Sequence, residues 1–274
     1  MPLKLMYLTN NSDIAKIAEK SGVDRIFIDL ELRGKVERQG HLDTVISYHS
    51  IDDIKKVKEV LNSSELLVRV NSIYDGSKTE IDSVIKNGAD IVMLPYFKTV
   101  GEVEKFVEYV DGRAKTCLLC ETPECVEIID EILKVQGIDE AHIGLNDLHL
   151  GYGLNFMFEL VANGTVEKLC NKFKEKGIKY GFGGVAKIGE GMLPGENVIK
   201  EHYRLGSSRV ILSRAFCDSS KITDLNEIEK LFSEGVENLR MVENEVKNMT
   251  AQEFSANHVE VQQKVQMIVK KIVG

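Results

Sequence analysis

The chain has 274 residues, of which 43% are hydrophobic, and its formal net charge is −8 at pH 7. This length can bury a large core, and the negative charge argues against a general binder of nucleic acids or anionic membranes. No uncharged apolar run of about 18 residues occurs, and the N-terminal "MPLKLMYLTNNSD" is too short for a secretory signal, so we expect a cytoplasmic protein without a membrane span.

Short apolar runs recur along the chain, and a segment with helical periodicity follows each of them. We predict eight strands, at residues 3–9, 25–31, 66–71, 90–96, 115–121, 140–147, 179–185 and 208–214. Eight strand-then-helix units with nearly continuous apolar strands predict an α/β fold, the (β/α)8 TIM barrel. A doubly wound open sheet is the alternative, but the first strand-helix turn lacks the glycine fingerprint of a dinucleotide site.

The pattern changes near residue 224, so we predict a barrel domain over 1–223 and a C-terminal helical arm over 224–274. The arm has an apolar stripe at spacings of three and four, made by Phe232, Val236, Leu239, Val242, Val246 and Met249. Such a stripe packs either on its own barrel or on a neighbouring subunit. We expect a homo-oligomer.

Polar residues gather where several predicted strands end. They are Asp29, Glu31, Arg69, Asn71, Glu121, Asn146, Asp147, Ser213 and Arg214. The C-terminal ends of barrel strands converge on one face, which is where TIM barrels keep their active sites.

Glu121 and Asp147 end adjacent strands and so predict a pair of metal ligands. Carboxylates, waters and substrate oxygens suit Mg²⁺ or Mn²⁺. The alternative is that each residue caps a following helix, although Thr122 before Pro123 is the better cap in its segment.

Arg69 lies in an otherwise apolar strand, "LLVRVN". A guanidinium in a barrel needs an anionic partner, and a substrate carboxylate bound through two hydrogen bonds would provide one. The alternative is an ion pair with Asp29 or Glu31 of the neighbouring strand, two residues that share one face.

Cys117 and Cys120 have the C-x-x-C spacing of redox and zinc sites. They lie within one predicted strand, and alternation along a strand would send their side chains to opposite faces. We therefore favour buried, reduced thiols over metal or redox chemistry.

Five motifs, in this order, resemble the HpcH/HpaI aldolase and citrate lyase β-subunit family of the phosphoenolpyruvate/pyruvate barrel superfamily. They are "DRIFIDLE", "LVRVN", "GADIVMLP", "ETPECVEIIDEIL" and "IGLNDLHLGYG", and the resemblance covers residues 5 to 216. It implies that Glu121 and Asp147 bind Mg²⁺ or a similar cation and that Arg69 holds the oxygens of a pyruvate-like substrate. The backbone amides of Gly144, Leu145 and Asn146 would then face the substrate carboxylate.

The resemblance therefore implies a class II-type aldolase, a metal-dependent lyase that breaks or forms a C–C bond beside the enolate of a 2-oxo acid. Its partner substrate would be an aldehyde or an acyl compound. An acyl-thioester lyase like the citrate lyase β-subunit and a non-catalytic barrel subunit are the alternatives.

The chain departs from the family pattern at the catalytic base. Aldolases of the family have a His where this chain has Leu32, and they often have a Gln where it has Leu119. The remaining catalytic candidates are Asp29, Glu31 and Arg69, with His149, in the loop after the sixth strand, as the nearest replacement base. His41 and His49 are weaker candidates.

Two loops could extend the site. The polar loop from Arg33 to His49 would reach an anionic or hydroxylated end of the substrate, unless it is only a solvated connector. The Gly-rich segment 181–191 could bind phosphate with help from Arg214, as loops after strands seven and eight often do, but a glycine cluster alone is a weak signal.

Overall fold

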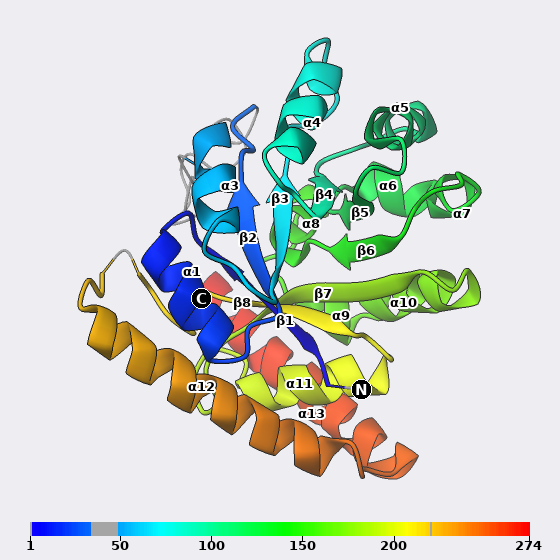
Figure 1. The fold of residues 1–274 in the computed structure, drawn as a ribbon. Coiled ribbons are helices and arrows are strands. Elements are labelled where there is room, and N and C mark those ends of the chain that lie inside the picture. Colours follow the sequence, from blue (N-terminus) through cyan, green and yellow to red (C-terminus); the bar gives the residue numbers. More distant parts are fainter. Residues whose placement is uncertain (1, 34–48, 220) are drawn as a thin grey trace.

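The computed structural model describes residues 2–33, 49–219 and 221–274. Eight parallel strands form a closed barrel in sequence order, with β1 paired to both β2 and β8 (Figure 1). The strands are β1 (Lys4–Leu8), β2 (Arg25–Asp29), β3 (Glu65–Arg69), β4 (Ile91–Leu94), β5 (Lys115–Cys120), β6 (Glu140–Ile143), β7 (Lys179–Val185) and β8 (Arg209–Leu212). The predicted (β/α)8 barrel is confirmed.

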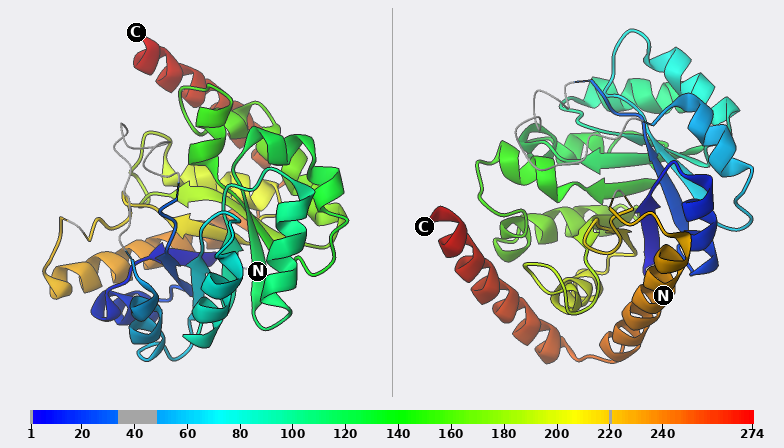
Figure 2. Two further views of the ribbon diagram at one scale, coloured as in Figure 1. Left: turned by 90° about the horizontal axis from the view of Figure 1, so that it is seen from above. Right: turned by 90° about the vertical axis from the view of Figure 1, so that its left-hand side faces the viewer.

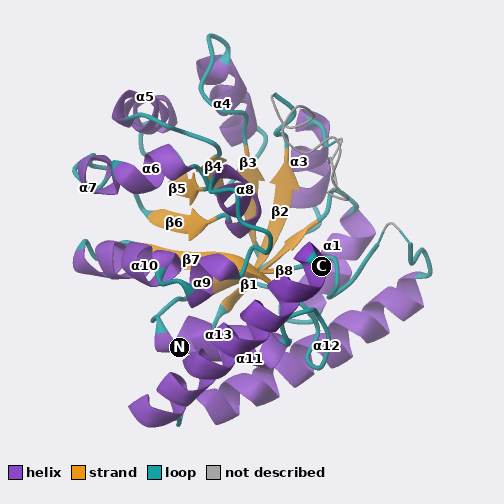
Figure 3. Ribbon diagram, turned by 180° about the vertical axis from the view of Figure 1, so that it is seen from behind, coloured by secondary structure: helices purple, strands orange, loops and turns teal. Residues whose placement is uncertain are grey.

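Helices surround the strands on the outside of the barrel (Figure 3). Those between strands are α1 (Ser12–Lys20), α3 (Ile51–Lys58), α4 (Ser77–Lys86), α5 (Val100–Val110), α6 (Pro123–Glu127), α7 (Ile129–Ile132), α8 (Leu145–Gly151), α9 (Glu159–Ala162), α10 (Thr165–Glu175) and α11 (Gly195–Arg204). Local sequence explains their starts. The Thr122 hydroxyl accepts from the backbone N–H of Cys125, which makes it the predicted cap of α6.

Side chains of the strands contribute to two separate apolar cores. The barrel interior holds Met6, Phe27, Leu67, Ile91, Met93, Cys117 and Leu119, whereas the larger core lies between the strands and the helices. Cys117 belongs to the inner core and Cys120 to the outer one, so the prediction that they point to opposite faces is confirmed. All five cysteines are buried and free.

The N-terminal end of the barrel interior contains buried charges. Arg25 donates to both carboxylate oxygens of Glu140, at 2.6 and 2.9 Å, and Arg209 lies 2.7 Å from the same carboxylate. Glu65 accepts a further bond from the Arg25 Nε at 2.9 Å. These pairs close the end of the barrel opposite to the predicted site.

The C-terminal segment forms two helices, α12 (Leu225–Val246) and α13 (Ala251–Val273). α12 packs between α1 and α11, where the eighth helix of a TIM barrel belongs, and Arg240 donates from it to the carbonyl of Leu3 at 2.8 Å. α13 packs on α11 and α9, and its end projects beyond the barrel (Figure 2). Both helices thus contact their own barrel, while a role in oligomerisation stays a prediction.

None of the helices in the described ranges combines the length and the apolar character that crossing a membrane requires.

Candidate active site

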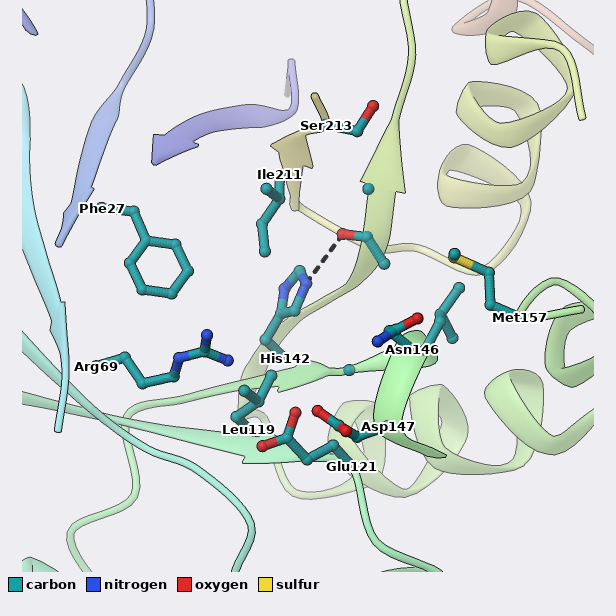
Figure 4. A pocket seen from close by; sticks show the side chains of 14 residues that line it. Phe27, Arg69, Leu119, Glu121, His142, Asn146, Asp147, Met157, Ile211 and Ser213 are labelled. Carbon is teal, nitrogen blue, oxygen red and sulfur yellow. Dashed lines mark hydrogen bonds between the residues drawn. The ribbon is translucent and has the colours of Figure 1, made fainter. Parts of the chain in front are cut away.

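A pocket of about 240 Å³ opens at the C-terminal ends of the strands, on the face where the sequence placed the site (Figure 4). It is lined by Phe27, Arg69, Leu119, Glu121, His142, Gly144, Leu145, Asn146, Asp147, Met157, Gly183, Gly184, Ile211 and Ser213. The predicted metal ligands, the predicted anion clamp and the three predicted substrate-binding residues therefore meet in one cavity.

Glu121 comes directly after β5, and its side chain is buried in the pocket wall, with 3% of its surface exposed. Its Oε1 accepts a hydrogen bond of 3.0 Å from the backbone N–H of Tyr96. Tyr96 has a φ of 49°, in the left-handed region that non-glycine residues rarely adopt. Strained backbone of this kind is concentrated at functional sites, and here it presents an N–H to the carboxylate.

Gly144 leaves the space that Glu121 occupies. A Cβ at this position would lie 2.8 Å from both the Cβ and the Oε2 of Glu121. No side chain can fit at such distances without displacing the carboxylate, so the glycine of the "IGLND" motif is explained by its contact with Glu121.

Asp147 lies in α8 and not at the end of a strand, which corrects the prediction for residues 140–147. β6 ends at Ile143, and the backbone turns into the helix at Gly144, whose carbonyl accepts from the N–H of Leu148 at 3.2 Å. Leu145 and Leu148 are buried with helical spacing, which explains why the apolar run continues past the strand. Asp147, in the first turn, is 8% exposed, and its carboxylate lies beside that of Glu121 (Figure 4).

The donor set of Glu121 and Asp147 fits a hard divalent cation. Mg²⁺ is commonly held through one or two carboxylates, with waters and substrate oxygens completing the octahedron. Within the described ranges, no group of three or more His, Cys, Asp or Glu side chains is placed to hold a metal ion. A cage made of protein ligands alone is therefore not formed by these residues, and the ligand pair suits an ion that substrate helps to bind.

Arg69 forms the predicted ion pair with Asp29 and Glu31 and also lines the pocket, while its binding of a substrate carboxylate stays a prediction. Its Nε and Nη2 donate to the two carboxylate oxygens of Asp29, each at 2.8 Å, and its Nη1 lies 3.4 Å from Glu31. Burial alone would lower the pKa of Arg69, but the charges of Asp29 and Glu31 raise it above the usual arginine value. The guanidinium is a fixed cation whose orientation Asp29 sets.

Asp29 is also linked to His49, one of the weaker base candidates. The backbone N–H of Asp29 donates to the Nδ1 of His49 at 3.1 Å. His41, like most of the polar loop 33–49, lies outside the described residues. Leu32, in the position of the family histidine, is 45% exposed and does not line the pocket.

His149 lies in the last turn of α8, which corrects its placement in a loop. Its Nδ1 donates to the carbonyl of Leu145 at 3.1 Å, and the residue is not among those that line the pocket. Of the predicted roles at this site, its role as the base has the least geometric support.

His142 lines the pocket but was not identified from the sequence. It lies on the inner face of β6, and its Nε2 is 3.1 Å from the carbonyl oxygen of Gly183. Burial lowers its pKa to about 4, and the charges of Arg209, Arg25 and Arg69 act in the same direction. In the sequence it is one polar residue within an apolar strand, a pattern that a packed core histidine would also give.

The Gly-rich segment contributes Gly183 and Gly184 to the pocket, beside Ser213 from the loop after β8. Arg214 is exposed and lies outside the pocket lining. These contacts place small residues at the pocket rim but add no further cation to its lining.

The family model for HpcH/HpaI aldolase/citrate lyase matches residues 4–159, more than half of the chain. Two solved structures share the fold. The HpcH/HpaI aldolase from Desulfitobacterium hafniense DCB-2 has a TM-score of 0.63 at 17% identity, over 84% of this chain and 93% of its own. An HpcH/Hpal aldolase/citrate lyase family protein from Burkholderia cenocepacia J2315 has a TM-score of 0.62 at 14% identity, over 83% of this chain and 94% of its own.

No curated protein matches the chain in a sequence comparison. The motif order, the closed barrel and the family model nevertheless agree. This chain belongs to the HpcH/HpaI aldolase/citrate lyase family, whose members are lyases of carbon–carbon bonds.

Proposed function

We propose that the protein is a divalent-metal-dependent carbon–carbon lyase that cleaves or forms the bond next to the enolate of a pyruvate-like 2-oxo acid. The observation that carries this proposal is the joint burial of the Glu121 and Asp147 carboxylates in one pocket wall, with the Arg69 guanidinium in the same cavity. Two anions and a fixed cation around a small cavity suit an anionic substrate held on a hard cation.

Glu121 and Asp147 would hold Mg²⁺ or Mn²⁺. When bound, such an ion supplies Lewis-acid stabilisation of negative charge on the carbonyl oxygen of a 2-oxo acid.

Arg69 would stabilise the same developing charge from the protein side. Its hydrogen bonds to Asp29 fix the guanidinium before the substrate arrives, so little reorganisation is needed as the enolate forms. Glu31 is a second carboxylate that lies close to the Arg69 guanidinium. The backbone N–H of Gly144 donates to the carbonyl of Cys120 at 3.0 Å, so the predicted contact with the substrate carboxylate falls to the amides of Leu145 and Asn146, at the start of α8.

The pocket volume favours a small substrate. About 240 Å³ lies below the range of about 300–1,000 Å³ that is typical of sites for drug-sized ligands. A short 2-oxo acid fits the cavity that the described residues form, whereas the bulk of an acyl thioester would have to lie outside it.

The test is deuterium exchange of the methyl protons of pyruvate in D₂O, followed by NMR with Mg²⁺ or Mn²⁺ added. We expect exchange that stops when the metal is chelated. Glu121→Gln should slow it at least about a hundredfold, the scale on which a lost stabiliser of transition-state charge acts.

Glu124→Gln is the matched control for this experiment. Glu124 lies on α6, three residues after Glu121, and its half-exposed side chain forms an ion pair with Lys98 at 2.7 Å. Its substitution should leave the exchange rate unchanged. A wild-type protein that exchanges no proton of any short 2-oxo acid with metal present, or a Glu121→Gln variant as fast as wild type, would refute the proposal.

Leu32 favours a second candidate, an acyl-thioester lyase related to the citrate lyase β-subunit, because "DLE" without the following histidine is the pattern of that branch. A requirement for coenzyme A or a carrier protein in the assay would identify it. Activity on the free acid alone would exclude it.

A further inference from the structure

His142 is a polar residue in an apolar part of the barrel interior, where it lines the pocket. It lies two residues before Gly144 on β6, and its side chain is 1% exposed. The neighbours that share the pocket floor include Phe27, Leu119 and Ile211, which offer no hydrogen-bonding group. Figure 4 shows the ring with Phe27 and Ile211 on one side and with Leu119 and the two carboxylates on the other.

The hydrogen bond of His142 fixes its tautomer. A carbonyl oxygen can only accept, so the Nε2 that faces the Gly183 carbonyl at 3.1 Å must bear the hydrogen. The Nδ1 is then a bare acceptor. This atom is buried and has no hydrogen-bond partner among the residues that the structure describes.

An unpaired acceptor buried in the lining of a pocket needs a donor that the described residues of the protein do not supply. Buried polar atoms are almost always hydrogen-bonded, and leaving one unpaired costs stability. The charged side chains that line the pocket do not supply this donor: Arg69 already donates to Asp29, and ionised carboxylates have no hydrogen to donate. A hydroxyl group of a ligand or a water molecule would supply this donor.

The ring is also better suited to accept a hydrogen bond than to remove a proton. With its pKa lowered to about 4 by burial and by nearby arginines, it is neutral at pH 7 and is a weak base. A proton abstracted from an alcohol would not stay on such a group. His142 is thus a positioning and selecting residue.

We propose that the Nδ1 of His142 accepts a hydrogen bond from a hydroxyl group of the substrate, so that the site prefers hydroxylated reactants to their deoxy counterparts. This inference rests on the proposed lyase function and specifies its substrate class. A site built around a substrate hydroxyl rejects the analogue that lacks it, because the buried acceptor is then left unpaired. The preference is a property of this chain's His142 and does not involve the metal ligands.

Binding gives a test that needs no catalysis. Protein with ¹⁵N-labelled histidine and Mg²⁺ is titrated with hydroxypyruvate or pyruvate, and with glycolaldehyde or acetaldehyde, two pairs that each differ by one hydroxyl. The hydroxylated member of at least one pair should move the Nδ1 resonance of His142 towards that of a hydrogen-bonded nitrogen. Equal shifts, or none, within both pairs would show that the nitrogen binds water only and would overturn the proposal.

Kinetics with the same pairs separates this inference from the function itself. We expect the wild-type ratio of kcat/KM for the hydroxylated over the deoxy reactant to fall at least tenfold in His142→Phe. His142→Asn, which retains an acceptor near the Nδ1 position, should recover part of it. An active wild-type enzyme whose preference survives His142→Phe refutes the role of His142 alone, whereas an inactive wild-type enzyme refutes the lyase proposal and leaves the binding test to decide.

His202→Phe is the control for loss of a buried imidazole elsewhere. His202 lies on α11, outside the pocket lining, stacked on Phe182 with ring centroids 3.8 Å apart. Its substitution should retain the substrate preference. Thermal melts of all variants show whether each is folded.

Discussion

Gly144 determines whether Glu121 can reach its place in the pocket. Alanine at this position would put a Cβ 2.8 Å from the Glu121 carboxylate, so we expect Gly144→Ala to displace the carboxylate. Metal affinity and exchange of substrate protons should each fall at least about tenfold, the lower end of what a disturbed metal site loses. Isothermal titration with Mn²⁺ measures the first effect directly.

Gly101→Ala is the matched control for Gly144→Ala. Gly101 is an exposed residue near the start of α5, and a Cβ added to it would point into open space, with no neighbouring group within 4 Å. Alanine there should leave metal binding unchanged and raise the stability by up to about 1 kcal/mol. Unchanged Mn²⁺ affinity in Gly144→Ala would contradict the close packing described for this residue.

At the residue scale, the sequence predicted those groups whose chemistry is unusual for their position. Glu121 and Arg69 interrupt apolar strands at ends that converge, so both were assigned to the site, and both line the pocket. His142 was not identified, because the sequence does not show which face of the strand a single histidine occupies or what its side chain contacts. The Nδ1 is an acceptor because the Nε2 faces the carbonyl of Gly183, which is 41 residues away in the sequence. A local sequence pattern does not contain such a long-range contact.

At the element scale, α8 shows why strand ends are hard to read from sequence. In the run "EAHIGLNDL", Ala141, Ile143 and Leu145 alternate as in a strand, Leu145 and Leu148 have helical spacing, and the transition occurs at Gly144. Gly144 adopts an extended backbone conformation that most residues could also adopt, so the backbone alone does not require a glycine at this position. The glycine is explained by contact with Glu121, which only the tertiary structure contains.

The position of α13 depends on a buried polar network, and this gives a prediction for the element. The side chain of Asn257 donates to Glu201 at 2.8 Å and accepts from Asn197 at 2.9 Å, both on α11. Asn257→Leu would leave these groups unpaired. We expect a loss of about 1–3 kcal/mol in the free energy of unfolding, with faster amide hydrogen exchange concentrated in α13.

Ser255→Ala is the control that shows whether the loss of stability in Asn257→Leu comes from the Asn257 hydrogen bonds. Ser255 is exposed on the same helix, and alanine is the better helix former, so stability should be unchanged or slightly higher. If amide protection of α13 in Asn257→Leu matched that of wild type, contacts other than this network would hold the helix.

At the scale of the whole molecule, the barrel separates two charged ends by an apolar layer. The functional end keeps its carboxylates around a cavity, whereas the opposite end pairs Glu140 with Arg25 and Arg209 in a filled interior. The repeated apolar runs predicted eight strands and hence the barrel, because parallel strands buried on both faces need them. They could not predict the pairing of Arg25 with Glu140, since these residues are 115 positions apart.

Glu140 is the group on which the closed end of the barrel depends. Glu140→Gln would leave two buried guanidinium groups with one carboxylate fewer, and removing one partner of a buried ion pair costs about 3–5 kcal/mol. Urea denaturation at pH 7 should show a loss of this size. Glu104→Gln, at an exposed position of α5, should change the stability by less than about 0.5 kcal/mol.

The difference in stability between Glu140→Gln and wild type should also depend on pH. Burial raises the pKa of Glu140, but Arg25 and Arg209 outweigh it, so the pKa in the folded protein is below the usual value. A carboxylate with a lowered folded pKa contributes its stability above the unfolded pKa of about 4.3 and loses it as pH falls through the folded value. The difference in the free energy of unfolding between wild type and Glu140→Gln should therefore be largest at pH 7 and should shrink progressively below about pH 4. A difference that stayed constant from pH 7 to pH 3 would show that packing, and not the charge of Glu140, stabilises this end of the barrel.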